Sequence, residues 1–308
     1  FFLLKKLYSI LFNSKHQLFL PVSRTGFLLL RDLIIRKSTS SLLDYNYNFS
    51  NNIILTLPIK EFFNQLSTIL ERNNIFNFYR QIKENIKFKN ITSFIENNIL
   101  EGKILIENNS IPLPILELPI LSPQLVIPPY NNYRDIFYKS NDLDVDLSMH
   151  ISSAVITEIT PLTLFLKYGI SYDNIIMEEP EISLHPELQQ QLTRVFIKLV
   201  NSNTNVLITT HSDTIVQHIN NMIKLNSNNN EERQKYLINE YRYDEDDLIS
   251  EDKVRMYQFN INKKYGFTKV TKLEGSKYGF EVPTFHNYLI KVSKEFDDFI
   301  DNIENTNE

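Results

Sequence analysis

"NIIMEEPEISLHPELQQQL" (174–192) places three carboxylates, those of Glu178, Glu179 and Glu181, directly after a short apolar run. Acidic side chains at the end of a buried strand repel one another and are costly to remove from water. They must therefore hold a cation or lie in an ordinary solvated loop. Both interpretations predict a strand that ends here and a helix that starts at Pro186, because proline is favoured in the first helical turn.

The surrounding region, 148–225, alternates between strand and helix patterns. Residues 154–168 have helical apolar spacing, and we expect Pro161 within or near the first turn of that helix. The segment 186–200 carries one apolar helical face, and "NVLITTHS" (205–212) is a second short run rich in apolar residues. Strand, helix, strand and helix with short connections predict an α/β fold, in which helices cover a parallel sheet.

Polar clusters follow both predicted strands. Glu178 and Glu179 follow the first, and Thr209–Ser212, which includes His211, follows the second. Ligands of parallel sheets bind beyond the carboxyl ends of the strands. One carboxylate would hold a hydrated Mg²⁺, another would orient a water molecule, and His211 would donate a hydrogen bond to a phosphoryl group. The pattern therefore predicts a magnesium-dependent phosphoryl-transfer site.

The rest of the chain shows weaker patterns. Apolar spacing predicts an inserted helical pair at about 60–100, and a hairpin turning at Asn108–Asn109. The acidic, Asn-rich stretch at about 225–252 predicts a flexible, solvated insertion, not a nuclease site, because no apolar strand precedes its acids. A C-terminal β-hairpin turning near 263–266 and an amphipathic helix at about 284–303 follow.

"IIMEEPEISLHPELQ" followed by "VLITTHSD" resembles the Walker B, D-loop and H-loop series of ABC-type ATPases. The similar branch contains the overcoming-lysogenization-defect and RecF-like proteins and predicted AAA defence ATPases. The resemblance covers about residues 18–30 and 148–300. It implies a P-loop NTPase fold, with residues 1–308 as the C-terminal part of one ABC-type ATPase domain.

The resemblance also implies roles for single residues. Glu178 would hold Mg²⁺ through water, and Glu179 would polarise the water that attacks ATP. His211 would contact the γ-phosphate. His185 stands where transporter relatives carry the D-loop aspartate, so it would lie close to the nucleotide.

"HISSAVITEITPLTLFLKY" (150–168) stands at the place of the family's signature motif. Ser152 and Ser153 would therefore reach the nucleotide of a second copy in a head-to-tail homodimer, although Ala154 replaces the expected glycine. Serines before a helix are also common N-caps, and this alternative stays open. For Arg24 in "LPVSRTG" the resemblance implies no role, and a structural ion pair or turn is the simpler interpretation.

An ATP site of this kind needs the phosphate loop G-x-x-x-x-G-K-[ST], whose backbone N–H groups bind the phosphates. None of the six glycines begins that pattern. We expect the loop to lie before Phe1, so that this chain alone hydrolyses ATP weakly or not at all. The alternative function is a non-catalytic interaction module with a degenerate ATPase fold.

Composition limits the remaining classes. The hydrophobic content of 42% allows a large core, and the absence of cysteine excludes disulfides and fits a reducing compartment. The net charge of -5 argues against a general nucleic-acid coat but leaves room for a local basic surface. The opening "FFLLKKLYSILF" is too short and too charged to span a membrane. We expect a cytoplasmic ATPase, with DNA or an effector protein as a further partner.

Overall fold

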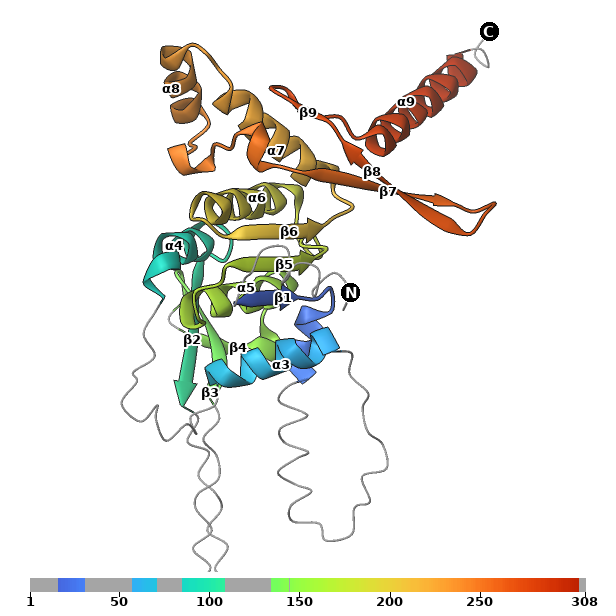
Figure 1. Ribbon diagram of the computed structural model, residues 1–308. Helices are drawn as coiled ribbons and strands as arrows, with labels where there is room; N and C mark the ends of the chain where they lie inside the picture. The colour runs from blue at the N-terminus through green and yellow to red at the C-terminus, as the bar shows by residue number, and fades with distance from the viewer. Residues whose placement is uncertain (1–15, 31–56, 71–84, 109–133, 144, 305–308) are drawn as a thin grey trace, which may run out of the picture. The chain divides into compact units, whose positions relative to one another are not determined.

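The computed structural model divides the chain into two compact units, 1–210 and 211–308, which are described separately (Figure 1). The predicted α/β class is confirmed, because the first unit contains a parallel sheet flanked by helices. The residues that the structure describes are 16–30, 57–70, 85–108, 134–143 and 145–304.

The parallel sheet has the order β1 (Gln17–Leu20), β5 (Asn174–Glu178) and β6 (Asn205–Thr209), and Figure 1 shows the strands side by side. All neighbours are parallel, with Leu18 opposite Ile175. The first four residues of β5 are buried. A central strand covered on both faces requires the continuous apolar run that its sequence shows.

Helices α3, α4, α5 and α6 lie among the described residues of the first unit. Helix α3 contacts β1 and α5, while α6 contacts β6 and α4. The predicted helical stretch at 60–100 thus contains α3 and α4. Its middle, residues 71–84, lies outside the described residues. That this stretch is an insertion stays a prediction. The bounds are α3 (Leu57–Leu70), α4 (Lys89–Asn98) after the 3-10 turn η2 (Ile86–Phe88), α5 (Ala154–Tyr168) and α6 (Pro186–Asn201).

Pro161 lies in the middle of α5, so its predicted place near the first turn was wrong. Proline cannot donate the helical hydrogen bond and usually kinks a helix. Here every residue from 157 to 167 is buried, and the hydroxyl of Thr160 donates to the carbonyl of Ile156 at 2.6 Å. Burial of this stretch of the helix therefore outweighs the local cost of the proline.

A second sheet of the first unit is antiparallel, with the order β2 (Gly102–Asn108), β3 (Arg134–Ser140) and β4 (Asp146–Ser148). The described partner of β2 is β3, with Gly102 opposite Ser140. The turn predicted at Asn108–Asn109 reaches residues outside the described part of the chain and stays a prediction.

A buried ion pair joins α5 to α4. The ammonium group of Lys167 lies 2.6 Å from a carboxylate oxygen of Glu96 and also donates to the carbonyl of Ile104 at 3.3 Å. Both side chains are almost fully buried. Because each charge compensates the other away from water, loss of one partner leaves an expensive buried charge.

The second unit confirms the predicted hairpin and amphipathic helix, and Gly266 has the positive φ of 67° that the hairpin turn requires. The predicted solvated insertion contains helix α8, none of whose residues is buried. None of the described helices is long and apolar enough to cross a lipid bilayer. The elements are α7 (Asp213–Asn226), α8 (Glu231–Glu240), η4 (Glu245–Asp247), η5 (Glu251–Lys253), β7 (Met256–Asn262), β8 (Phe267–Leu273), β9 (Gly275–Ser276), β10 (Gly279–Phe280) and α9 (Pro283–Glu304).

Replacing Lys167 by Met should lower the free energy of unfolding by about 3–5 kcal/mol, because Glu96 is left buried without its cation. The double variant Lys167→Met/Glu96→Gln should recover part of this loss. Urea denaturation measures both. The control is Lys291→Met, which removes an exposed pair with Glu295 and should change stability by less than about 0.5 kcal/mol. Equal effects of Lys167→Met and Lys291→Met would contradict this interpretation.

Candidate functional site

The predicted carboxylates lie where β5 ends. Glu178 is the last residue of the strand, and Glu179 adopts a left-handed conformation with φ of 42°. The N–H of Glu179 donates to the carbonyl of Thr209 at 2.9 Å, which ties this turn to the end of β6. A non-glycine residue in this region costs about 1–2 kcal/mol, and such strain is concentrated at functional sites.

Arg24 binds the main chain of both glutamates. Its guanidinium donates one hydrogen bond to the carbonyl of Glu178 at 2.7 Å and another to that of Glu179 at 3.1 Å. A third goes to the carbonyl of Pro21 at 3.1 Å. The side chain of Arg24 is fully buried. It therefore fixes the segment after β1 against the segment after β5.

Glu158 of α5 compensates the charge of Arg24. The two form a buried ion pair, and the hydroxyl of Thr25 donates to the same carboxylate. Burial lowers the pKa of Arg24, which the charge of Glu158 partly offsets. Burial also raises the pKa of Glu158, and Arg24 counteracts this shift. The pair thus attaches α5 to the two strand ends.

The simpler interpretation of Arg24, a structural ion pair, is confirmed, but the sequence analysis did not single out its partner Glu158. A signal was present, because Glu158 is the only charged residue in the otherwise apolar and Thr-rich stretch 154–166. A single acid inside a buried helix requires a cation close by. What the sequence could not show is that the cation comes from a segment more than a hundred residues earlier.

The carboxylates themselves lie at the surface of this framework. Glu178 and Glu179 are half-buried, and a carboxylate oxygen of Glu178 accepts the N–H of Val22 at 3.4 Å. Arg24 also feels the charges of Glu178 and Glu181, so part of the repulsion within the acidic run is balanced by this cation.

The donor set suits Mg²⁺, which takes oxygen ligands and is often held by one or two carboxylates while keeping several waters. Within the described residues, no group of three or more His, Asp or Glu side chains has metal-binding geometry. The residues present therefore fit a hydrated ion held by Glu178 or by both glutamates, and not an all-protein cage.

The two candidate signature serines serve the start of α5. Ser153 is its N-cap, and the hydroxyl oxygen accepts the N–H of Ile156 at 3.4 Å. Ser152 donates to the carbonyl of Ser148 at 2.9 Å. The capping interpretation is confirmed for Ser153, whose side chain is nevertheless exposed. Contact with a nucleotide stays a prediction.

The two histidines lie at helix starts. His185 is the N-cap residue of α6, is exposed, and makes no side-chain capping bond. His211 is exposed and precedes Ser212, which caps α7 by accepting the N–H of Ile215 at 3.2 Å. His211 begins the second unit, so its convergence with Glu179 stays a prediction.

Residues 156–216 match the family model described as AAA ATPase domain. The matched segment runs from α5 through β5, α6 and β6 to α7, and includes Glu178, Glu179, His185 and His211. This segment is therefore similar to AAA ATPase domains. Membership of the branch with the overcoming-lysogenization-defect and RecF-like proteins stays a prediction.

A solved structure from a study of the "ATP-driven dimerization and DNA stimulated activation of SMC ATPases" aligns at a TM-score of 0.35 and 11% identity. The alignment covers 61% of this chain and 83% of that chain. At this TM-score the likeness does not locate a site. No curated protein matches the chain.

Replacing Arg24 by Met should lower the free energy of unfolding by about 3–5 kcal/mol, because Glu158 and three carbonyls lose a buried donor. The double variant Arg24→Met/Glu158→Gln should lose less than the sum of the two single variants. Chemical denaturation of all four proteins measures this coupling. Strict additivity would show that the ion pair does not stabilise the strand ends.

Replacing Ser153 by Ala should cost about 1 kcal/mol, since the N-cap of α5 is lost. Ser153→Asp retains a capping oxygen and should keep wild-type stability. Thermal unfolding followed by circular dichroism compares the two variants. Equal destabilisation by both substitutions would show that the cap contributes nothing.

Proposed function

We propose that this chain carries the Walker B half of an ABC-type ATPase site, which binds ATP with Mg²⁺ and hydrolyses ATP once a phosphate loop completes it. The observation that carries this proposal is the geometry at the end of β5. There Arg24 holds the main chain of Glu178 and Glu179 at the carboxyl end of a central parallel strand, inside the segment that matches the AAA ATPase domain.

Each carboxylate has a distinct role in the proposed reaction. Bound Mg²⁺ would neutralise charge on the phosphates. Glu178 would hold this ion through water, and Glu179 would accept a hydrogen bond from the attacking water and orient it. The left-handed backbone of Glu179 distinguishes it from Glu178, which ends the strand, and this supports separate roles for the two residues.

His211 would donate a hydrogen bond to the γ-phosphate. It follows β6, the strand whose terminal residue Thr209 accepts the N–H of Glu179. Carboxyl ends of neighbouring parallel strands lie at one sheet edge, where ligands bind. This supports a phosphate site at the carboxyl ends of β5 and β6, and the role of His211 in it rests on the resemblance of its motif alone.

We further propose a head-to-tail homodimer with nucleotide between the copies. Ser152, Ser153 and His185 would approach the nucleotide of the second copy, and the exposure of Ser153 and His185 supports such a contact. Closure of the dimer on ATP and opening after hydrolysis would drive a conformational change that DNA or an effector protein senses.

A second candidate is a non-catalytic interaction module with a degenerate ATPase fold. One observation favours it: none of the six glycines of residues 1–308 begins a phosphate loop. The first measurement is therefore to read the coding sequence upstream of the Phe1 codon. An in-frame G-x-x-x-x-G-K-[ST] supports the ATPase, whereas its absence there and in neighbouring genes supports the module.

In a product that includes such a loop, Glu179→Gln should lower kcat for ATP hydrolysis by about 100-fold or more, because the group that orients water is lost. Affinity for a fluorescent ATP analogue should change little. Phosphate release and fluorescence titration measure the two effects. The 308-residue chain alone should show weak or no hydrolysis.

The matched control is Glu187→Gln, which makes the same chemical change at an exposed position in the first turn of α6. It should leave kcat unchanged. A wild-type rate for Glu179→Gln would remove Glu179 from the mechanism. Failure of the longer product to bind the analogue would favour the interaction module.

A further inference from the structure

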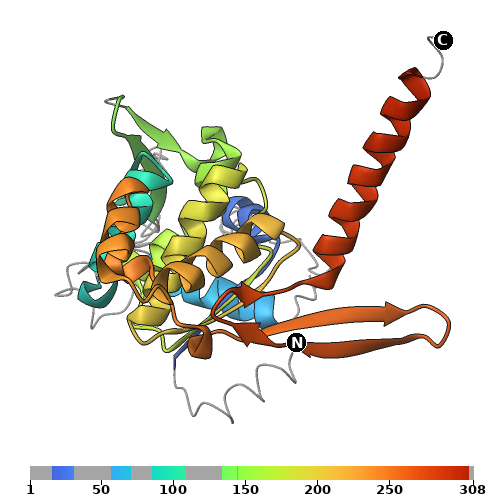
Figure 2. The same ribbon diagram turned by 90° about the horizontal axis from the view of Figure 1, so that it is seen from above.

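The hairpin of the second unit concentrates positive charge in an acidic protein. Residues 253–278, here called the basic arm, contain seven lysines and arginines and a single acidic residue, Glu274. The whole chain has a net charge of -5. Figure 2 shows that β7 and β8 form a long two-stranded ribbon. A local charge of this density attracts anionic partners even when the protein as a whole is acidic.

The basic arm also exposes aromatic rings. Five Tyr and Phe side chains are each more than half exposed, which exceeds the scattered single apolar residues of an ordinary surface. Exposure of these rings to water is unfavourable because of the hydrophobic effect, and a partner that covers them would recover this free energy. They are Tyr257 (54% exposed), Phe259 (67%), Tyr265 (67%), Phe267 (52%) and Tyr278 (66%).

Strand pairing places cations beside the rings. Tyr257 and Phe259 share one face, and Tyr257 lies opposite Lys272. Near the turn, the rings of Tyr265 and Phe267 stack with centroids 6.3 Å apart, and the Lys264 ammonium lies 5.3 Å from the centroid of Tyr265. Tyr257 and Tyr265 therefore each have a positive charge within side-chain reach.

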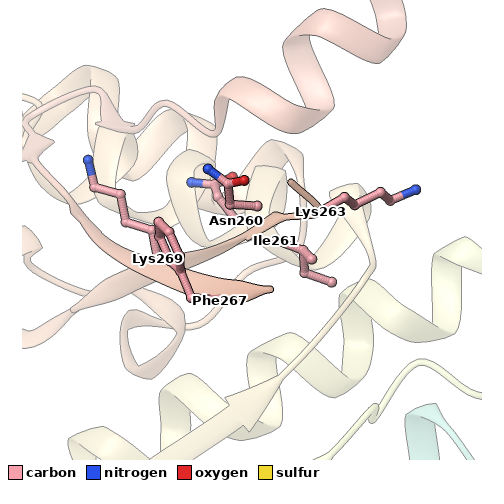
Figure 3. Close-up of a pocket in the computed structure, with 6 residues that line it drawn as sticks. Asn260, Ile261, Lys263, Phe267 and Lys269 are labelled. Atoms are coloured by element: carbon pink, nitrogen blue, oxygen red, sulfur yellow. The ribbon is translucent and has the colours of Figure 1, made fainter. Parts of the chain in front are cut away.

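The cations are spread along the arm. A hollow at the hairpin is lined by Lys263 and Lys269 among others, and Figure 3 shows these two side chains extending in different directions. They do not converge on one small anion. Charges separated along an extended arm instead match a polymer that carries many phosphates.

We propose that the basic arm binds single-stranded nucleic acid. Its lysines would contact phosphates, and its exposed rings would stack on unpaired bases. The rings favour a single strand over a duplex, because the faces of paired bases are already stacked on one another. This site is separate from the proposed ATP site and does not depend on it.

The first test is fluorescence anisotropy of a labelled oligothymidine of about 20 nucleotides, long enough for one such site. The variant Lys263→Gln/Lys264→Gln/Lys269→Gln should bind at least tenfold more weakly at low salt. The slope of log affinity against log salt should shrink by about 2, since each lost phosphate contact contributes roughly 0.7 on a single strand.

The matched control is Lys224→Gln/Lys235→Gln/Lys294→Gln. It removes the same charge from exposed positions on α7, α8 and α9 of the same unit. The control should bind the oligothymidine within about twofold of wild type. Salt screens charges that lie more than about one Debye length from the bound strand, so these lysines should contribute little. Equal weakening by both triple variants would overturn the proposal, because net charge alone would then explain binding.

Replacing rings tests stacking separately. Phe259→Ala/Tyr265→Ala should weaken oligothymidine binding by about tenfold or more without changing the salt slope. Phe259→Leu/Tyr265→Leu keeps apolar side chains but removes the rings, and should weaken binding as well. Wild-type affinity in both variants, with circular dichroism confirming their fold, would overturn the stacking role.

Binding of three further ligands, namely oligouridine, a DNA duplex and lipid vesicles, distinguishes the classes of partner. Oligouridine binding as tightly as oligothymidine, or more tightly, supports the proposal and indicates RNA as the source. A duplex bound more tightly than the single strand would overturn it. Binding to vesicles of phosphatidylserine and phosphatidylcholine without binding to either oligonucleotide would also overturn it, and would indicate a membrane surface instead.

Discussion

The buried pair of Arg24 and Glu158 is the interaction on which the first unit depends. Two opposite charges leave water only where hydrogen bonds satisfy the rest of each group. Arg24 meets this condition by donating to main-chain carbonyls, two of them from Glu178 and Glu179. One side chain therefore joins β1, β5 and α5, so the position of the acidic turn follows from packing and not from the carboxylates themselves.

This arrangement separates the framework from the chemistry. If Arg24 paired with the side chains of Glu178 and Glu179, their charges would be neutralised and unsuited to a cation. Its nitrogens instead bind the backbone and Glu158. The half-buried carboxylates of Glu178 and Glu179 are thus left out of the ion pair of Arg24 and stand on a rigid base, which is what a site that positions a hydrated ion and a water molecule requires.

Local pattern was sufficient to predict the elements at the candidate site and the C-terminal hairpin, and insufficient to predict their partners. The runs that became β5, α6 and β6, and the turn near Gly266, follow from periodicity, Pro186 and glycine. The hydrogen bonds of Arg24 to Glu178 and Glu179 span sequence separations of 154 and 155 residues. No local pattern encodes contacts over such a separation. Pro161 was misplaced for a related reason: burial from the surrounding elements, invisible in the segment itself, outweighs its local preference.

The net charge of this protein is a poor guide to its partners, because charges in salt solution interact only over distances shorter than the basic arm. At physiological salt, charges separated by more than about 8 Å are largely screened from each other. A seven-residue strand such as β7 spans about 23 Å at 3.3 Å per residue, so the hairpin turn lies well beyond that distance from the start of β7. A polyanion at the hairpin turn would interact with Lys263 and Lys264 far more strongly than with Glu251 and Asp252, which precede β7.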